Sequence, residues 1–156
     1  MRGARLRTVL CDYFAAPSDD AAAGALEAFD VEFVDFKNAD PFVLFGKLEA
    51  LLTGATYGAV TADPRQGDLI AAEDECLVVS VTDALTTALA TATPEALAAA
   101  AAAWTGADEW FGPALEPSAA DLAGLADYLL TGLTATAALA TSAQARGERL
   151  YCRASV

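Results

Sequence analysis

The chain closes with ERLYCRASV, residues 148–156, directly after a long segment that is rich in alanine and threonine. Leu150 and Cys152 alternate with Tyr151, and alternation with a period of two is typical of a β-strand. A terminal strand has to pair with strands from earlier in the chain. The ending therefore predicts a β-sheet with the preceding helix packed against it.

A partner for that strand is RLRTVLCDYF, residues 5–14, where Val9, Cys11 and Tyr13 would share one face. We expect the first and last strands to be neighbours, because the chain ends of compact domains often lie close together. This pairing would gather basic side chains on one side of an acidic body, with nearby acids to offset them. The bases are Arg5, Arg7, Arg149 and Arg153, and the candidate acids are Glu32, Asp35 and Glu148.

The segment after the first strand predicts a helix and a second strand. PSDD, residues 17–20, breaks the strand, and Ser18 is a suitable N-cap for an alanine-rich helix that extends to about Phe29. VEFVDFK, residues 31–37, alternates cleanly between its two faces. The chain therefore begins with a strand–helix–strand unit.

The clearest helix signal is NADPFVLFGKLEALLTG, residues 38–54. Asp40 caps this helix, Pro41 takes the first helical position, where its missing N–H costs nothing, and Gly54 ends it. One apolar stripe at three- and four-residue steps is formed by Val43 or Leu44 with Leu48, Leu51 and Leu52.

The second half of the chain alternates between loop, strand and helix signals. Residues 55–74 mix Gly, Pro and Asp and predict a long loop, and ECLVVSV predicts a short buried strand. Further helices begin after Thr82, Thr93 and Ser118. The sequence thus predicts a single α+β domain over all 156 residues, with one small mixed sheet of about four strands packed by about five helices.

The charge of the chain is acidic and unevenly spread. The formal net charge is -13, and no Lys or Arg occurs from Gln66 to Ala145, although acids recur there. Such a surface repels phosphate backbones, so we expect no nucleic acid as a partner. The excess negative charge either keeps the protein soluble or attracts a basic protein partner.

Three features predict a cytoplasmic protein with no membrane partner. Charge returns at Asp12, too soon for the apolar region of a secretory signal. Tyr128–Ala145 carries no charge but is poor in Leu, Ile, Val and Phe, which favours a buried helix over a membrane span. Cys11, Cys76 and Cys152 are far apart and form no CxxC motif, which is typical of buried, reduced thiols.

Several chemistries are excluded by missing residues. The chain has no histidine, so Ser-His-Asp and Cys-His catalysis and histidine-ligated zinc are impossible within it. Neither GxxxxGK nor GxGxxG occurs, and Pro17 stands where a phosphate-binding loop around Cys11 needs arginine. We therefore expect no metal, no cofactor and no catalytic residue.

Carboxylates remain as candidates for acid–base work or cation binding. One group is Asp12 with Asp19 and Asp20 at the end of the first strand, and the other is Asp108 with Glu109 beside Trp110. Helix capping accounts for Asp19 and Asp20 without any chemistry, and solvated loop charge accounts equally for Asp108 and Glu109.

An aromatic loop supplies further candidates. WTGADEWFGP, residues 104–113, brings two indoles and Phe111 together. The indoles either plug the side of the core or line a groove for a ligand or partner. The candidate binding residues are Asp12, Tyr13, Trp104, Glu109 and Trp110.

Three segments together resemble the YfbM-like family of uncharacterised bacterial proteins, from about Asp35 to the end. They are KLEALLTG at 47–54, VSVTDALTTALATATPEALA at 79–98 and ARGERLYCRASV at 145–156. Members carry a helix that ends in Leu-Leu-Thr-Gly, a Leu-Thr-type helix cap and a helix–Gly–strand ending. They usually have a histidine and a tryptophan before Leu-Leu-Thr-Gly, and here that stretch is PFVLFGKLEALLTG. The resemblance implies a compact α+β domain, and it carries no implication about activity, because no activity is established for the family.

These observations favour a non-catalytic module that binds a protein partner, as an immunity-like or regulatory protein does. The alternative is a small-molecule-binding protein or enzyme that uses Asp12, Tyr13 and the Trp104–Trp110 loop. A deep pocket holding those groups would favour the alternative, and a flat acidic face would favour the protein-binding module.

Overall fold

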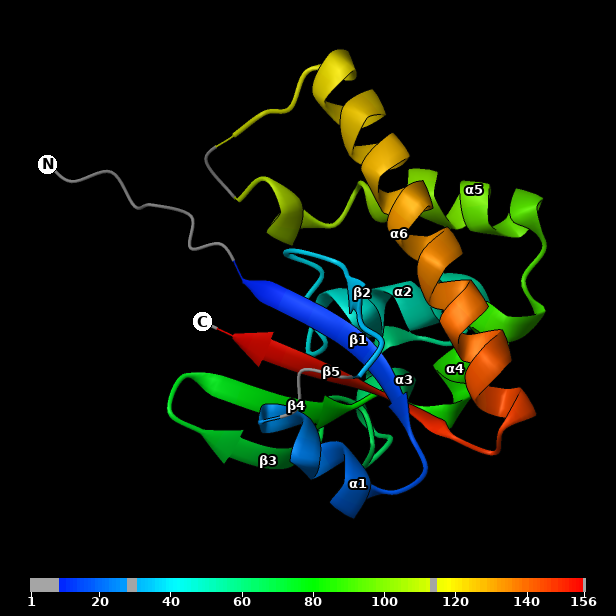
Figure 1. The fold of residues 1–156 in the computed structure, drawn as a ribbon. Helices are drawn as coiled ribbons and strands as arrows, with labels where there is room; N and C mark the ends of the chain where they lie inside the picture. Colours follow the sequence, from blue (N-terminus) through cyan, green and yellow to red (C-terminus); the bar gives the residue numbers. More distant parts are fainter. Residues whose placement is uncertain (1–8, 28–30, 113–114, 156) are drawn as a thin grey trace, which may run out of the picture.

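The computed structural model describes residues 9–27, 31–112 and 115–155 and shows an α+β fold (Figure 1). The strands are β1 (Leu10–Ala16), β2 (Val34–Asp35), β3 (Leu69–Glu73), β4 (Cys76–Ser80) and β5 (Arg149–Ser155). The helices are α1 (Asp19–Ala23), α2 (Leu44–Thr53), α3 (Tyr57–Thr61), α4 (Asp83–Thr91), α5 (Pro94–Trp104) and α6 (Ala119–Ala145). Short 3-10 turns follow α1 at Gly24–Leu26 and α5 at Asp108–Trp110. The strands form one sheet in the order β2-β1-β5-β4-β3.

The first and last strands are neighbours, as the sequence predicts. β1 and β5 pair antiparallel along their full length, with Tyr13 opposite Cys152 and Phe14 opposite Tyr151. Alternation sends Tyr13 and Cys152 to one face of the sheet and Phe14 and Tyr151 to the other. β5 also pairs with β4, so the final segment of the chain lies at the centre of the sheet.

Helices cover the two faces of the sheet unequally (Figure 1). On one face α2, α4, α5 and α6 contribute to a large core that includes Tyr13, Leu48 and Leu133. On the other face α1 and the turn after it cover a smaller core around Phe14 and Tyr151. The two-faced alternation of β1 and β5 explains how one sheet supports both cores.

The arginines of β5 bind acids that the sequence reading did not select. Arg149 Nε lies 3.3 Å from Asp83 Oδ1 at the start of α4. Arg153 Nη2 lies 3.3 Å from Asp12 Oδ2 on β1, and Glu148 pairs with Arg146. Arg5 and Arg7, the other members of the predicted basic cluster, lie outside the described residues.

Side-chain caps begin the helices where the sequence predicts them. The hydroxyls of Ser18, Thr82, Thr93 and Ser118 each accept a hydrogen bond from the backbone N–H three residues later. Asp121 completes a capping box with Ser118. These four helix starts therefore confirm the local reading of the sequence.

The prediction of one long loop over residues 55–74 is wrong. Thr56 caps α3, and β3 pairs with β4 across a two-residue turn at Asp74 and Glu75. The alanines of β3 weaken its strand signal, and a turn this short forces the antiparallel direction. Over the described residues the sheet has five strands, roughly as predicted, and each of its pairings is antiparallel, so the prediction of a mixed sheet is wrong.

Two N-terminal elements are shorter than predicted. α1 ends at Ala23 and tightens into the 3-10 turn that begins at Gly24, whereas the sequence predicts a helix to about Phe29, which is outside the described residues. The strand predicted over residues 31–37 is reduced to β2, in which Val34 and Asp35 pair with β1, and the Phe36 N–H donates a further hydrogen bond to the Cys11 carbonyl at 2.8 Å.

The helix predicted from Asp40 begins at Leu44. Asp40 Oδ1 accepts hydrogen bonds from the N–H groups of Phe42 and Val43, at 2.9 and 2.6 Å, so it caps the turn before α2. Gly54 ends α2 with a φ of 75°, the left-handed conformation that glycine adopts without strain.

The buried face of α2 differs from the predicted apolar stripe at one position. Leu51 is 44% exposed, although the sequence places it in the stripe. Glu49 is buried instead, beside Leu48. The helix is therefore rotated so that a carboxylate, rather than a leucine, enters the core.

α6 is buried along one side only. Its buried residues, among them Leu129, Leu133 and Ala140, face the large core. By length and composition α6 could cross a membrane, and 17% of its most apolar window is buried in this fold. α6 is thus buried along one side and exposed along the rest of its surface, and the N-terminal part of α6 projects beyond the sheet (Figure 1).

Candidate functional site

Tyr13 and Trp104, two of the predicted binding residues, are fully buried in the large core. The Tyr13 hydroxyl donates a hydrogen bond to the carbonyl of Ala39, and Trp104 Nε1–H donates one to the carbonyl of Leu44, at 3.0 Å. Burial raises the pKa of Tyr13 well above its usual value. Both polar groups are therefore already bonded inside the protein.

Aromatic stacking joins Tyr13, Trp104 and Trp110 into one cluster. The rings of Tyr13 and Phe45 stack at 4.1 Å, and Phe45 meets Trp104 edge-on at 6.0 Å. Trp110 packs on Trp104 at 5.0 Å and donates its Nε1–H to the Trp104 carbonyl at 2.9 Å. This arrangement agrees with indoles that plug the side of the core.

Asp12 belongs to the opposite face of the sheet from Tyr13. Its carboxylate pairs with Arg153, and the Arg153 guanidinium lies 4.1 Å from the centre of the Phe33 ring. The strand alternation that buries Tyr13 therefore separates the two residues. The five predicted residues do not converge on one pocket among the described residues.

Glu109 forms a bidentate ion pair with Lys47 of α2, at 2.7 and 2.8 Å. Partial burial acts to raise the pKa of Glu109, but the Lys47 ammonium and a backbone hydrogen bond lower it below its usual value. The pair ties the loop after α5 to α2, which is a structural use of the carboxylate.

A shallow apolar hollow of about 340 Å³ lies beside this ion pair. Its lining includes Lys47, Leu51, Tyr57 and Trp104. Trp104 is the single member of the predicted set among the lining residues. The hollow is thus distinct from the deep pocket that the small-molecule alternative requires.

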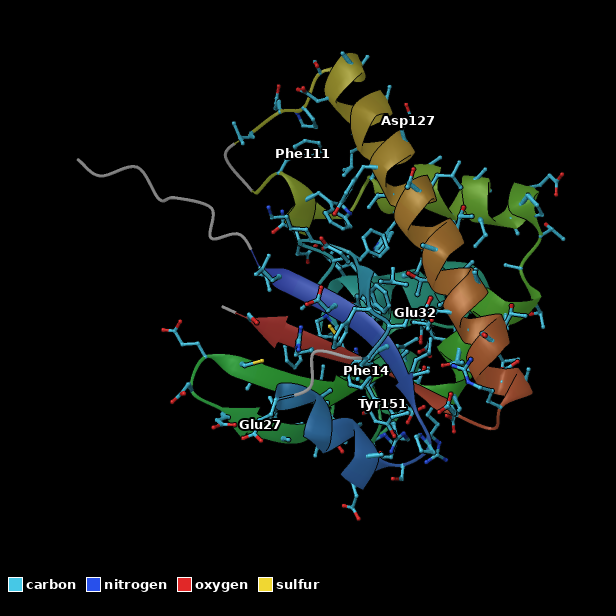
Figure 2. The ribbon with its side chains drawn as sticks, in the orientation of Figure 1. Phe14, Glu27, Glu32, Phe111, Asp127 and Tyr151 are labelled. Carbon is cyan, nitrogen blue, oxygen red and sulfur yellow. The ribbon has the colours of Figure 1, made fainter. Side chains whose placement is uncertain are left out.

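A larger hollow of about 480 Å³ lies at the end of the sheet where β4 begins and β5 ends. Four exposed carboxylates and the half-buried Cys76 line it, and Figure 2 shows Glu27 beside the β3–β4 hairpin. The carboxylates are those of Glu27, Glu73, Asp74 and Glu75. We call this hollow and its four acids the acidic end of the sheet.

The ion pairs in the described part of the chain lie away from the acidic end of the sheet. Each of the five ion pairs there joins a Lys or Arg to an acid outside the acidic end of the sheet. One of these pairs belongs to a network that joins Arg65 and Tyr151 to Asp19. The four carboxylates of the acidic end therefore have no ion pair within residues 9–27, 31–112 and 115–155.

Sequence reasoning did not find the acidic end of the sheet. Glu73-Asp74-Glu75 is visible as an acidic run, but the sequence reading placed it in and beside a loop. Glu27 and the end of β5 come from opposite ends of the chain, so only the fold brings them to this run. The available signal was a run of three acids at a turn.

Tyr151 is buried beside Asp19. Burial and the hydrogen bond that it donates to Asp19 raise its pKa to about 12. The Arg65 guanidinium lies 5.8 Å from the centre of the same ring and pairs with Asp19 at 3.1 Å. The network fixes the segment before β3 against α1 and β5.

The cysteines are free thiols, as predicted. Cys11 and Cys152 are buried, but Cys76 is half-buried, because it lies at the rim of the acidic end of the sheet. The prediction of burial is therefore wrong for Cys76.

Glu49 is the one described carboxylate in the core, with 5% of its surface exposed. The Thr82 hydroxyl donates a hydrogen bond to Glu49 Oε1 and accepts one from the N–H of Leu85. A cavity of about 10 Å³ lined by Glu49, Gln66 and Thr82 has room for one water. Burial raises the pKa of Glu49, and the Thr82 hydrogen bond offsets part of that rise.

Replacing Glu49 with glutamine is expected to stabilise the protein at pH 7 and not at pH 4. A raised pKa in the folded state means that the stabilising contribution is present at low pH and is lost as the pH rises through that pKa. Glutamine keeps the acceptor for Thr82 and removes the buried charge. Urea unfolding at a series of pH values measures the difference, with the exposed Glu75→Gln as the control. An unchanged pH dependence in Glu49→Gln contradicts the expectation.

Comparison with protein-family models, with curated proteins and with solved structures gives no match for this chain. The resemblance to the YfbM-like family therefore stays a prediction.

Proposed function

We propose that this protein is a non-catalytic module that binds a basic segment of a partner protein through the acidic end of its sheet. The observation that carries the proposal is the group of four exposed carboxylates around one hollow, without an ion pair among the described residues. A cationic segment would supply the missing charge and gain in association rate from the acidic field. An immunity-like or regulatory protein of the cytoplasm has this kind of activity.

The small-molecule alternative has less support. The polar groups of Tyr13 and Trp104 are bonded to backbone carbonyls in the core, and Asp12 lies on the other face of the sheet. An enzyme needs such groups to converge beside a substrate.

The test uses a fluorescein-labelled octalysine peptide and measures its binding by fluorescence anisotropy. In the variant Glu73→Gln/Asp74→Asn/Glu75→Gln we expect the affinity to fall by about tenfold, since three exposed charge pairs each contribute up to about 1 kcal/mol. Asparagine suits position 74, where φ is 53°. Binding to the unmodified protein should weaken as salt rises.

The matched control removes three other exposed acids, Glu95→Gln/Asp108→Asn/Asp127→Asn, which lie on α5, the turn after it and α6. Both variants change the net charge by three. Equal losses of affinity in the two variants would show a general charge effect and would refute a specific site at the acidic end of the sheet.

A further inference from the structure

β3 is the open edge of the sheet. At the other edge, β2 has two residues and α6 packs on it. β3 has five residues, and among the described strands it pairs only with β4. It contains no Lys or Pro, residues that commonly protect an exposed edge from pairing, and the register shift in its ladder is confined to Leu69–Ala71, before Ala72. Leu69, at its start, is 57% exposed.

The turn geometry shows which backbone groups point outward from β3. A two-residue turn makes Glu73 and Cys76 a hydrogen-bonded pair, and pairs alternate along an antiparallel ladder. Ala72, opposite Leu77, is therefore a non-bonded position whose N–H and C=O face away from β4. These two groups and the exposed Ala72 side chain are available to another strand.

The acidic residues at both ends of β3 favour a basic binding partner at this edge. Asp68 precedes the strand, and Glu73 with the Asp74-Glu75 turn closes it, all of them exposed. A second copy of the protein would bring the same acids against them, with a net charge of -13 on each molecule. An extended segment with Lys or Arg residues would instead place opposite charges across the ladder.

We propose that an extended segment of a partner protein, bearing lysine or arginine, adds to β3 as a further strand of the sheet. Backbone hydrogen bonds to Ala72 would align the segment, and its cations would meet Asp68 and the acidic end of the sheet. This inference rests on the proposed function and adds to it the conformation of the partner and the edge that receives it.

The test compares Ala72→Pro with Ala72→Thr, using a fluorescein-labelled octapeptide of alternating lysine and valine. Proline removes the outward N–H without touching the β3–β4 ladder, and threonine keeps that N–H. We expect Ala72→Pro to weaken binding by about tenfold, the loss that accompanies one backbone hydrogen bond, and Ala72→Thr to bind like the unmodified protein. A second peptide, N-methylated at its valine amides, should bind the unmodified protein no better than the unmethylated peptide binds Ala72→Pro.

The outcomes separate the two proposals. If the triple variant at residues 73–75 weakens binding and Ala72→Pro does not, the edge proposal is overturned and the proposed function stands. If neither variant weakens binding, both fail. If light scattering shows a dimer that Ala72→Pro converts to a monomer, the occupant is a second copy and the proposal is overturned. Should Ala72→Pro not fold, full binding of the N-methylated peptide overturns the proposal.

Discussion

Replacing Gly132 with alanine is expected to lower the free energy of unfolding by about 3 kcal/mol, at the upper end of overpacking costs in a protein core. Gly132 is buried on α6, and an added Cβ would lie 2.4 Å from two atoms of the Phe36 ring. A shift of the Phe36 ring is costly, because Phe36 is fully buried and packs edge-on with the rings of Tyr13, Trp104 and Tyr128. Chemical unfolding with urea measures the loss.

The same helix offers a matched control. Gly124 on α6 has no atom within 4 Å of an added Cβ. Gly124→Ala should stabilise the protein by about 0.5–1 kcal/mol, because glycine in a helix interior is unfavourable. A Gly132→Ala variant as stable as Gly124→Ala would contradict the packing described for Phe36.

Replacing Trp104 with alanine is expected to cost about 3–5 kcal/mol, the usual range for a large aromatic side chain in a core. Trp104 is fully buried and contacts Phe36, Phe45 and Trp110. Trp104→Phe should cost less, although it leaves the Leu44 carbonyl without its donor, a loss of about 1–3 kcal/mol. Urea unfolding followed by circular dichroism measures both variants.

The binding assay gives the second readout for this residue. Trp104→Phe, where it folds, should bind the basic octalysine peptide with unchanged affinity, because Trp104 lies outside the acidic end of the sheet. Trp110→Phe, at a half-buried position, is the control and should be less destabilising. If Trp104→Phe is as stable as the unmodified protein but loses peptide binding, the aromatic loop is part of the binding site and the purely structural role of Trp104 is contradicted.

Local signals in the sequence predicted the parts of the fold that depend on local physics. The Ser118–Asp121 capping box and the alternation of Leu150, Tyr151 and Cys152 each involve neighbours in the chain, so their spacing is sufficient to identify them. The pairing of β1 with β5 followed from two such strands and a preference for chain ends to meet.

Features that depend on tertiary contacts escaped the sequence reading. β3 has a weak strand signal because two of its five residues are alanine, and its pairing depends on the turn at Asp74. Glu49 enters the core because Thr82, thirty-three residues later, donates a hydrogen bond to it. The acidic end of the sheet combines Glu27 with the β3–β4 hairpin, and no sequence spacing predicts that meeting.

The central place of β5 has a consequence for synthesis on the ribosome. Among the described strands, β1 and the β3–β4 hairpin are joined in the sheet through β5, which is made after both of them. Until residues 149–155 emerge, the nascent chain holds two separate fragments of sheet with unsatisfied edges. The complete sheet is therefore expected to form only after residues 149–155 have emerged, and the strands made earlier would be natural clients for chaperones during elongation.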